Sequence, residues 1–204
     1  MDVPDPPLIR SFLSATVEEV TNLILSSKDA TCSLDLIPTK LLKTSVDVLA
    51  PPITHFINLC LSEGVFPDSF KRAIVKPLIK KHTLPKDDLS SYRPISNLNF
   101  ISKILEKVIQ TRLTKHLESF ESISKFQSAY RKNFSTETAL TRIQNDLLLA
   151  SNNREVSALV LLDLSAAFDT LDHGILLDRL KCSFGVCDSA LAFISITPET
   201  DDHD

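Results

Sequence analysis

The sequence predicts an α+β protein in which helices predominate, and three observations lead to this fold class. Apolar residues recur at helical spacing over several stretches, most clearly over 100–120. Two shorter stretches, 71–81 and 156–162, are instead rich in β-branched and apolar residues and predict strands. With 43% hydrophobic and 24% charged residues among 204, the composition is that of one folded globular domain, or of one domain with an arm.

Residues 1–65 are predicted to form a helical arm. Apolar residues recur at helical spacing over 16–27, where either Ser14 or Thr16 can act as the N-cap and two glutamates occupy the first turn. A second helix is predicted over 38–49. The two prolines that follow it must interrupt or restart the helix, because proline lacks the N–H that an interior position donates. A third helix then ends at a glycine, a common helix C-cap residue.

The middle of the chain, 66–155, combines extended and helical patterns. Lys71–Lys81 predicts a strand, and Pro77 places that strand at a sheet edge. Ser91–Leu98 is expected to be extended around its Arg-Pro pair, and the amphipathic helix over 100–120 follows. The next helix is predicted to begin at a Ser-Thr-Glu-Thr sequence, a partial capping-box pattern, and to run to residue 149.

The C-terminal part begins with Val156–Leu162, where Ser157 alone is polar. This pattern predicts a strand buried on both faces, which ends at Asp163. After a turn, a final helix is predicted to start over 175–180, and 193–204 is expected to be a divergent polar tail.

Charge is distributed unevenly along the chain, although the net charge is only −4. Lys71–Lys132 contains 14 Lys or Arg against 5 Asp or Glu, a balance of +9, and the rest of the chain has a balance of −13. A basic middle between acidic flanks suits a groove for nucleic acid or nucleotides, because phosphate contacts dominate such binding. Solvated helix faces are the open alternative.

Several classes of protein are disfavoured by composition. With 3 glycines the chain has no Gly-rich phosphate loop, and its 4 cysteines lack metal or disulfide spacing, so reduced thiols are expected. The first residues lack a basic and an apolar segment, which predicts a nuclear or cytoplasmic rather than a secreted protein. No apolar run approaches the roughly 18 residues of a membrane span.

Asp163 is the strongest candidate for chemistry. A buried strand that ends in a carboxylate can hold a Mg²⁺ ligand rigidly, and catalytic Mg²⁺ takes only one or two protein carboxylates. The alternative is structural: Asp163 caps the turn after the strand, while Asp169 and Asp172 cap the next helix.

The segment LVLLDLSAAFDTLDH, 159–173, resembles motif A of the reverse transcriptases of LINE-type non-LTR retrotransposons. The resemblance implies that Asp163 is the first catalytic, metal-binding aspartate and that the backbone carbonyl of Leu164 assists a second metal. It also implies that Phe168 is a steric gate against a ribose 2′-hydroxyl and that Asp169 has a supporting role.

Two further segments resemble the same family in the same order. SYRPISNLNFISKILEKVIQTRL, 91–113, is similar to the fingers motif whose arginine approaches the incoming nucleotide, a role that falls on Arg93. FQSAYRKNFSTETAL, 126–140, is similar to the Q-x-G-F-R segment, with Ala129-Tyr130 in place of Gly-Phe and with Arg131 retained. For both arginines, the alternative role is that of a helix-end or surface ion-pair residue.

Upstream, EGVFPDSFKRAIVKPLIKK, 63–81, resembles the entry to the fingers, which implies that Lys80 and Lys81 face nucleic acid or triphosphate. DLIPTKLLK, 35–43, resembles the preceding D-G-I-P helix start, although Leu36 replaces the usual glycine.

The resemblance covers 10–192 and implies a right-hand polymerase fold. Residues 66–155 would be a fingers-like region, and 156–192 the start of the palm with its first strand. The family also implies Mg²⁺ as cofactor, with an RNA template, a DNA primer and deoxynucleoside triphosphates as partners. Oligomeric state stays open.

The sequence contains no F/Y-x-D-D segment, which carries the second pair of catalytic carboxylates in this family. We therefore expect a reverse transcriptase fragment with an incomplete palm, inactive alone, so that enzymatic activity of this chain stays an open question. The alternatives are a domesticated, non-catalytic nucleic-acid-binding module and a retroelement relic without function.

Overall fold

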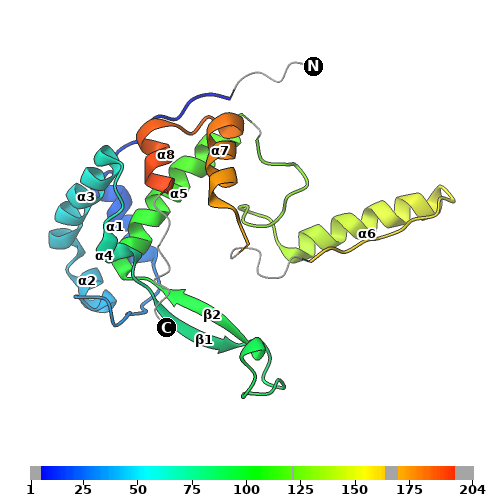
Figure 1. The fold of residues 1–204 in the computed structure, drawn as a ribbon, viewed down its shortest axis with the longest axis horizontal. Helices are drawn as coiled ribbons and strands as arrows, with labels where there is room; N and C mark the ends of the chain where they lie inside the picture. Colours follow the sequence, from blue (N-terminus) through cyan, green and yellow to red (C-terminus); the bar gives the residue numbers. More distant parts are fainter. Residues whose placement is uncertain (1–5, 121, 164–169, 196–204) are drawn as a thin grey trace. The chain divides into compact units, whose positions relative to one another are not determined.

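The computed structural model describes residues 6–120, 122–163 and 170–195 of the chain (Figure 1). Helices predominate, and the described residues form one two-stranded sheet, which confirms the predicted α+β class. None of the described helices is both long enough and apolar enough to cross a membrane. In chain order the elements are α1 (Val17–Ser26), α2 (Thr39–Thr44), α3 (Val46–Glu63), α4 (Asp68–Lys71), β1 (Ile74–Ile79), the 3₁₀ turn η1 (Leu89–Ser91), β2 (Tyr92–Asn97), α5 (Phe100–Ser119), α6 (Thr136–Asn152), α7 (His173–Phe184) and α8 (Asp188–Ser195).

The chain divides into two compact units. The first comprises Met1–His116 and His173–Asp204, and the second comprises Leu117–Asp172. The hairpin and most helices belong to the first unit, and α6 belongs to the second. These units group residues that contact one another, so the predicted division into arm, fingers, palm and tail stays a prediction.

The first unit has a hydrophobic core to which α1, α3, α5 and α8 contribute. α1 packs against α3, and α8 contacts both α3 and α7. Because one face of each helix is apolar, packing removes that face from water, and each Å² of apolar surface contributes about 25 cal/mol. The largest fully buried apolar side chains are Val20, Ile24, Ile57, Leu61, Ile104, Leu105, Val108 and Val186.

Local sequence signals set the ends of three helices as predicted. Thr16 rather than Ser14 caps α1, and its Oγ1 accepts a hydrogen bond from Glu19 N–H at 3.1 Å. Ser135 caps α6 in a complete capping box with Thr138. Helix α3 ends at a glycine with φ of +68°.

The prolines of the arm lie inside a helix, which corrects the expectation that they interrupt or restart it. Pro51 and Pro52 are interior residues of α3, and the helical sequence breaks earlier, at Ser45. Both prolines are exposed, so water can satisfy the two helical carbonyls that lose an N–H partner. The buried face of α3, which includes Ala50 and Thr54, packs in the core and holds the helix together.

β1 pairs antiparallel with β2, so both of the extended stretches predicted in this region form a hairpin. Pro77 lies opposite Pro94. Lys80 N–H donates to Ser91 O at 2.8 Å, and the alternation of an antiparallel ladder then makes Pro77–Pro94 a non-hydrogen-bonded pair. Neither proline removes a bond from the ladder, which explains why the strands tolerate both.

Asp35 connects the loop before α2 to the start of α5. Its Oδ2 accepts a hydrogen bond from Cys32 N–H, and its Oδ1 accepts one from Phe100 N–H, both at 2.6 Å. Asn99 Oδ1 accepts from Ser102 N–H at 2.7 Å in the same helical turn. Because a helix N-terminus favours a carboxylate, this contact holds the loop against the junction of β2 and α5.

The Val156–Leu162 segment is not a strand, and this prediction was wrong. It follows α6 in irregular conformation, and its side chains are exposed, Val160 by 74% and Leu162 by 90%. A strand needs a neighbour to take its backbone hydrogen bonds, and the sheet formed by the described residues pairs only β1 with β2. The apolar run therefore has strand propensity without a strand partner among the described residues.

Candidate nucleic-acid and nucleotide interface

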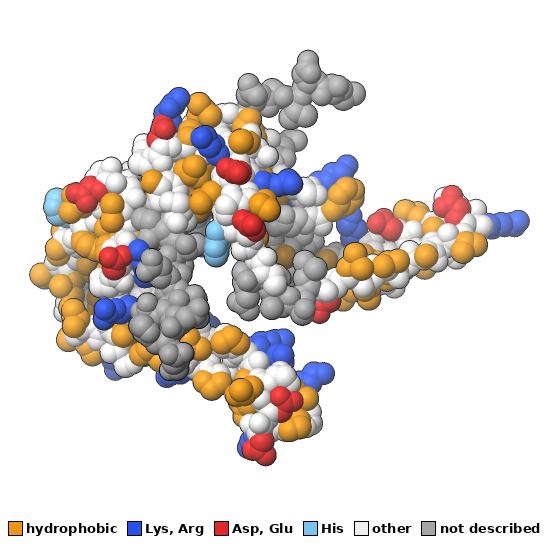
Figure 2. Space-filling view, viewed as in Figure 1, with side chains coloured by type: hydrophobic (Ala, Val, Ile, Leu, Met, Phe, Trp, Pro, Cys, Tyr) orange, Lys and Arg blue, Asp and Glu red, His pale blue; other side chains and the backbone are white. Residues whose placement is uncertain are grey.

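Three cations share one face of the β1–β2 hairpin. Residues directly opposite in an antiparallel pair point to the same face, and Leu78 lies opposite Arg93. Arg93 therefore shares a face with Lys76 and Lys80, and each lysine is its diagonal neighbour at about 7–8 Å. All three are exposed. Figure 2 shows Lys and Arg side chains over the hairpin, at the lower edge of the view, mixed with apolar and acidic ones.

The tip of the hairpin carries two lysines, Lys80 and Lys81, and one hydrogen-bonded carboxylate, Asp88. Lys80 Nζ donates to Ser90 O at 2.8 Å, and Asp88 Oδ1 accepts from Ser90 N–H at 2.8 Å. Hydrogen bonds from Ser90 hold the pKa of Asp88 below its ordinary value, and the charge of Lys80 adds to this effect. Lys81 is exposed and forms no ion pair with a described residue.

Arg131 lies in the second unit, in the loop before α6. Its Nη1 donates to the carbonyls of Ser124 and Gln127, both at 3.3 Å, and its guanidinium lies 4.7 Å from the ring centroid of Phe134. Arg131 forms no ion pair with a described carboxylate, and its predicted contact with a nucleotide stays a prediction. The side chain instead stabilises the loop that carries it.

Asp163 is exposed and lies at the end of the described part of its segment. Leu164, Phe168 and Asp169, the other predicted residues of this motif, lie outside the described residues. Within the described ranges, no three His, Cys, Asp or Glu side chains are grouped so that they could hold a metal ion. Among the described residues, Asp163 therefore does not belong to a group of three or more potential metal ligands.

A small cavity lies at the base of the hairpin, on the same face as Arg93. Its volume is about 60 Å³, and its lining comes from β1, β2, α5 and the loop before α2: Ala30, Thr31, Cys32, Ser33, Ile74, Lys76, Asn97 and Lys103. Lys76 and Lys103 were not among the predicted site residues. Lys76 could have been recognised from the sequence, because it is four positions from Lys80 and so lies on the same strand face. Lys103 could not, because only the tertiary structure brings α5 to the hairpin.

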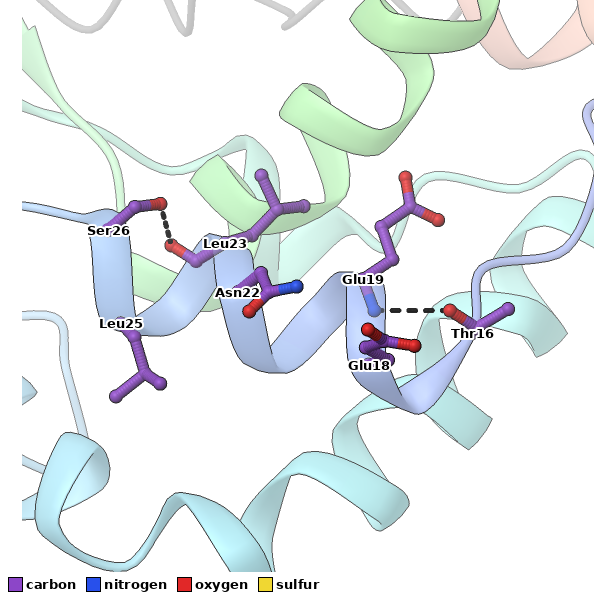
Figure 3. Close-up of a pocket in the computed structure, with 7 residues that line it drawn as sticks. All are labelled: Thr16, Glu18, Glu19, Asn22, Leu23, Leu25 and Ser26. Carbon is purple, nitrogen blue, oxygen red and sulfur yellow. Dashed lines mark hydrogen bonds between the residues drawn. The ribbon is translucent and has the colours of Figure 1, made fainter.

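A larger and more open depression, of about 740 Å³, lies along α1 (Figure 3). The described residues that line it belong to this helix and its cap, and none is a predicted site residue. Figure 3 shows Glu19 pointing toward α5, where it pairs with Arg112. The depression lacks the converging polar groups of a ligand site, so the hairpin face is the better candidate.

Known proteins match the chain over most of its length. The family model described as "Reverse transcriptase (RNA-dependent DNA polymerase)" matches residues 79–197. The RNA-directed DNA polymerase from mobile element jockey of Drosophila melanogaster is 34% identical over 173 residues, which cover 84% of this chain and 19% of that protein. The probable RNA-directed DNA polymerase from transposon X-element of the same species is 30% identical over 173 residues, 85% of this chain and 18% of that protein.

The chain therefore spans less than a fifth of the length of these relatives. The range that matches the family model includes both Arg93 and Asp163. The resemblance to LINE-type non-LTR reverse transcriptases that the motifs indicate is thus confirmed, and the chain belongs to the reverse transcriptase (RNA-dependent DNA polymerase) family.

Proposed function

We propose that this chain carries the fingers of an RNA-directed DNA polymerase domain, and that the hairpin face binds the phosphates of an incoming deoxynucleoside triphosphate. Arg93 and Lys80 supply the positive charge, with Lys81 beside them. The observation that carries this proposal is the register of the hairpin, which puts Arg93 and Lys80 on one exposed face. A guanidinium fork matches phosphate oxygens in two places at once, and the adjacent ammonium adds charge.

In the complete polymerase domain, the same proposal gives Asp163 the role of a Mg²⁺ ligand, assisted by the backbone carbonyl of Leu164. Phe168 then selects against a ribose 2′-hydroxyl, Asp169 has a supporting rather than a ligating role, and Arg131 contributes to nucleotide binding. Mg²⁺ when bound neutralises triphosphate charge and activates the primer hydroxyl. An RNA template, a DNA primer and deoxynucleoside triphosphates are the partners that the family implies.

Removal of the hairpin guanidinium should weaken nucleotide binding. We expect Arg93→Ala to raise the Kd for dTTP with Mg²⁺ about tenfold, equivalent to about 1.4 kcal/mol, because a charge-assisted bidentate contact is lost. Arg93→Lys should be intermediate, since it keeps the charge without the fork. Isothermal titration calorimetry measures both.

Arg72→Ala is the matched control, because Arg72 is an exposed arginine just before the hairpin and outside the proposed site. It should leave the Kd for dTTP within about twofold. Equal weakening by Arg72→Ala and Arg93→Ala would show a general charge effect and contradict the assignment of Arg93.

The 204-residue polypeptide is expected to extend no primer by itself. Its sequence lacks an F/Y-x-D-D segment, so the second catalytic carboxylates of the family have no counterpart within it. Primer extension on an RNA template with Mg²⁺ and all four deoxynucleotides checks this expectation. Template-dependent synthesis that disappears in Asp163→Asn would refute the claim of inactivity and at the same time support the role of Asp163.

A non-catalytic nucleic-acid-binding role is the second candidate, and the exposed basic face of the hairpin favours it. That role needs no metal ligand, whereas catalysis needs more than Asp163. The two differ in their response to Asp163→Asn in any longer polypeptide that supplies the remaining palm. Nucleic-acid binding would persist in both cases, and DNA synthesis would be lost if Asp163 is catalytic.

A further inference from the structure

We infer that the cavity at the base of the hairpin binds one phosphate of a nucleic-acid backbone through Lys76 and Lys103. The inference rests on the second candidate function, nucleic-acid binding by the hairpin, and it goes further by assigning a separate phosphate position at the base of the hairpin. Its starting point is that two lysines from different elements, β1 and α5, line one small cavity.

The size of the cavity suits a single oxyanion. A volume of about 60 Å³ holds roughly four water molecules or one tetrahedral phosphate group. Two further residues that carry hydroxyl groups, Thr31 and Ser33, also line it. It is too small for a nucleobase together with its sugar, so a base cannot be the group that enters.

The electrostatics of the cavity are unbalanced. Neither Lys76 nor Lys103 forms an ion pair with a described carboxylate. The two acids of the adjoining loop are already occupied: Asp29 pairs with Lys43 at 2.5 Å, and both oxygens of Asp35 accept backbone hydrogen bonds. On the same helix the charge of Lys103 opposes the rise that burial causes in the pKa of Glu106, so Lys103 is near one carboxylate without forming an ion pair with it. Two lysines beside one such carboxylate leave an excess of positive charge, which favours an anionic ligand.

The register of the hairpin favours a backbone phosphate over a free one. Lys76, Arg93 and Lys80 follow one another along one face in steps of two residues, since Arg93 lies opposite Leu78. Each step is about 6.7 Å, close to the separation of successive phosphates in an extended single strand. A strand that reaches the hairpin tip can therefore place another phosphate in the cavity at its base.

The loop that forms the cavity wall is held rigidly. Asp35 ties Cys32 to Phe100, and Cys32 Sγ donates to Asn97 O at 3.6 Å. These contacts join the loop to both β2 and α5, so the backbone that forms this wall of the cavity is held in place without a ligand. A preformed site loses less conformational entropy when it binds.

The test is RNA binding by the 204-residue chain, measured by fluorescence anisotropy with a labelled single-stranded RNA at several salt concentrations. Lys76→Gln with Lys103→Gln should weaken binding at least tenfold at low salt. It should also reduce the slope of log K against log salt by about 0.7, the value for one phosphate contact on a single strand. Lys76→Arg with Lys103→Arg keeps both charges and should restore binding to within about threefold.

Lys107→Gln is the matched control, because it removes one charge from an exposed position on the same helix. It should weaken binding by less than about threefold and leave the slope unchanged. The inference would be overturned if Lys107→Gln and either single cavity substitution weakened RNA binding equally. RNA binding by the wild-type chain would still leave the proposed function intact.

Titration with dTTP and with inorganic phosphate separates the two sources of a phosphate group. Because a cavity that suits one oxyanion can also admit inorganic phosphate, the inference requires that the cavity variant bind dTTP as the wild type does and lose RNA affinity. If the variant loses dTTP or phosphate affinity but keeps RNA affinity, the cavity takes a free anion and the assignment to a nucleic-acid backbone is wrong. If the wild type binds no RNA at low salt, the inference fails, whereas the nucleotide test on Arg93 still decides the proposed function.

Discussion

Gly185→Ala is expected to lower the free energy of unfolding by about 4 kcal/mol. Gly185 has φ of +67°, and a Cβ at this position would lie 2.3 Å from the carbonyl oxygen of Pro7. The left-handed conformation costs an alanine about 1–2 kcal/mol. The collision must in addition displace the N-terminal arm from the C-terminal helices.

That displacement breaks identified contacts. Ile9 N–H donates to Gly185 O at 2.9 Å, Cys187 N–H donates to Ile9 O at 3.0 Å, and Ile9 forms a parallel bridge with the fully buried Val186. Each hydrogen bond contributes about 1 kcal/mol. Against a typical stability of about 5–15 kcal/mol, this single methyl group should remove a large part of the total. Urea denaturation measures the loss.

Gly64→Ala is the control, because Gly64 has nearly the same φ, +68°, but its added Cβ would lie 3.1 Å from the Cβ and the carbonyl oxygen of Ser189, a much milder contact than 2.3 Å. We expect a smaller loss of about 2 kcal/mol, mostly from the left-handed conformation. Equal losses for the two variants would show that the contact with Pro7 has no role and that backbone conformation alone sets the effect.

Arg112→Ala is expected to lower the free energy of unfolding by about 3 kcal/mol at pH 7. Arg112 reaches from α5 to α1, where its guanidinium pairs with the carboxylate of Glu19. It also donates to the carbonyls of Leu13 and Ser14, each at 3.2 Å. Both side chains of the pair are mostly buried, the arginine 14% exposed and the glutamate 27%. Truncation therefore leaves a poorly hydrated carboxylate and two carbonyls without their donor.

Arg112→Lys and Glu19→Gln separate charge from geometry in this contact. The lysine variant keeps the charge but cannot reach both the carboxylate and the carbonyls, so it should recover only part of the loss. A double-mutant cycle of Arg112→Ala with Glu19→Gln gives the coupling energy, which we expect to exceed about 1 kcal/mol. A coupling energy near zero would mean that the contact with the carboxylate does not stabilise the fold.

The same pair predicts how stability depends on pH. The hydrogen bond from Arg112 holds the pKa of Glu19 below its ordinary value of 4.5, against the opposing effect of burial. A carboxyl with a lowered pKa in the folded state contributes stability that is complete above its ordinary pKa and is lost as pH falls through the folded value. Wild-type protein should therefore lose stability below about pH 4.5 more steeply than Glu19→Gln does. Parallel profiles for the two proteins would contradict this assignment.

Features that depend on neighbouring residues could be predicted from the sequence. Thr16 and Ser135 cap helices because their hydroxyls bond to amides three residues away, and Gly64 ends a helix because glycine adopts positive φ without strain. The hairpin strands could be recognised from their β-branched residues. The family could be recognised as well, because its motifs are short, occur in a fixed order and contain charged residues at characteristic positions.

Two predictions failed because a local pattern does not specify its surroundings. The apolar run Val156–Leu162 has the composition of a buried strand, but a strand exists only with a partner to share its backbone hydrogen bonds. Pro51 and Pro52 were expected to break a helix, yet burial of the opposite face of α3 outweighs the hydrogen bonds they remove. In both cases the deciding interaction lies outside the segment itself.

By itself the sequence determined the helix caps, the extended stretches and the resemblance of Asp163 and its neighbours to motif A, since each depends on residues within a few positions. Only the tertiary structure decided which distant residues meet. Glu19 and Arg112 are 93 positions apart, Asp35 and Phe100 are 65 apart, and Lys76 and Lys103 share a cavity across two elements. Such contacts form because packing of the core brings helix faces together, and no periodicity along the chain encodes which faces those will be.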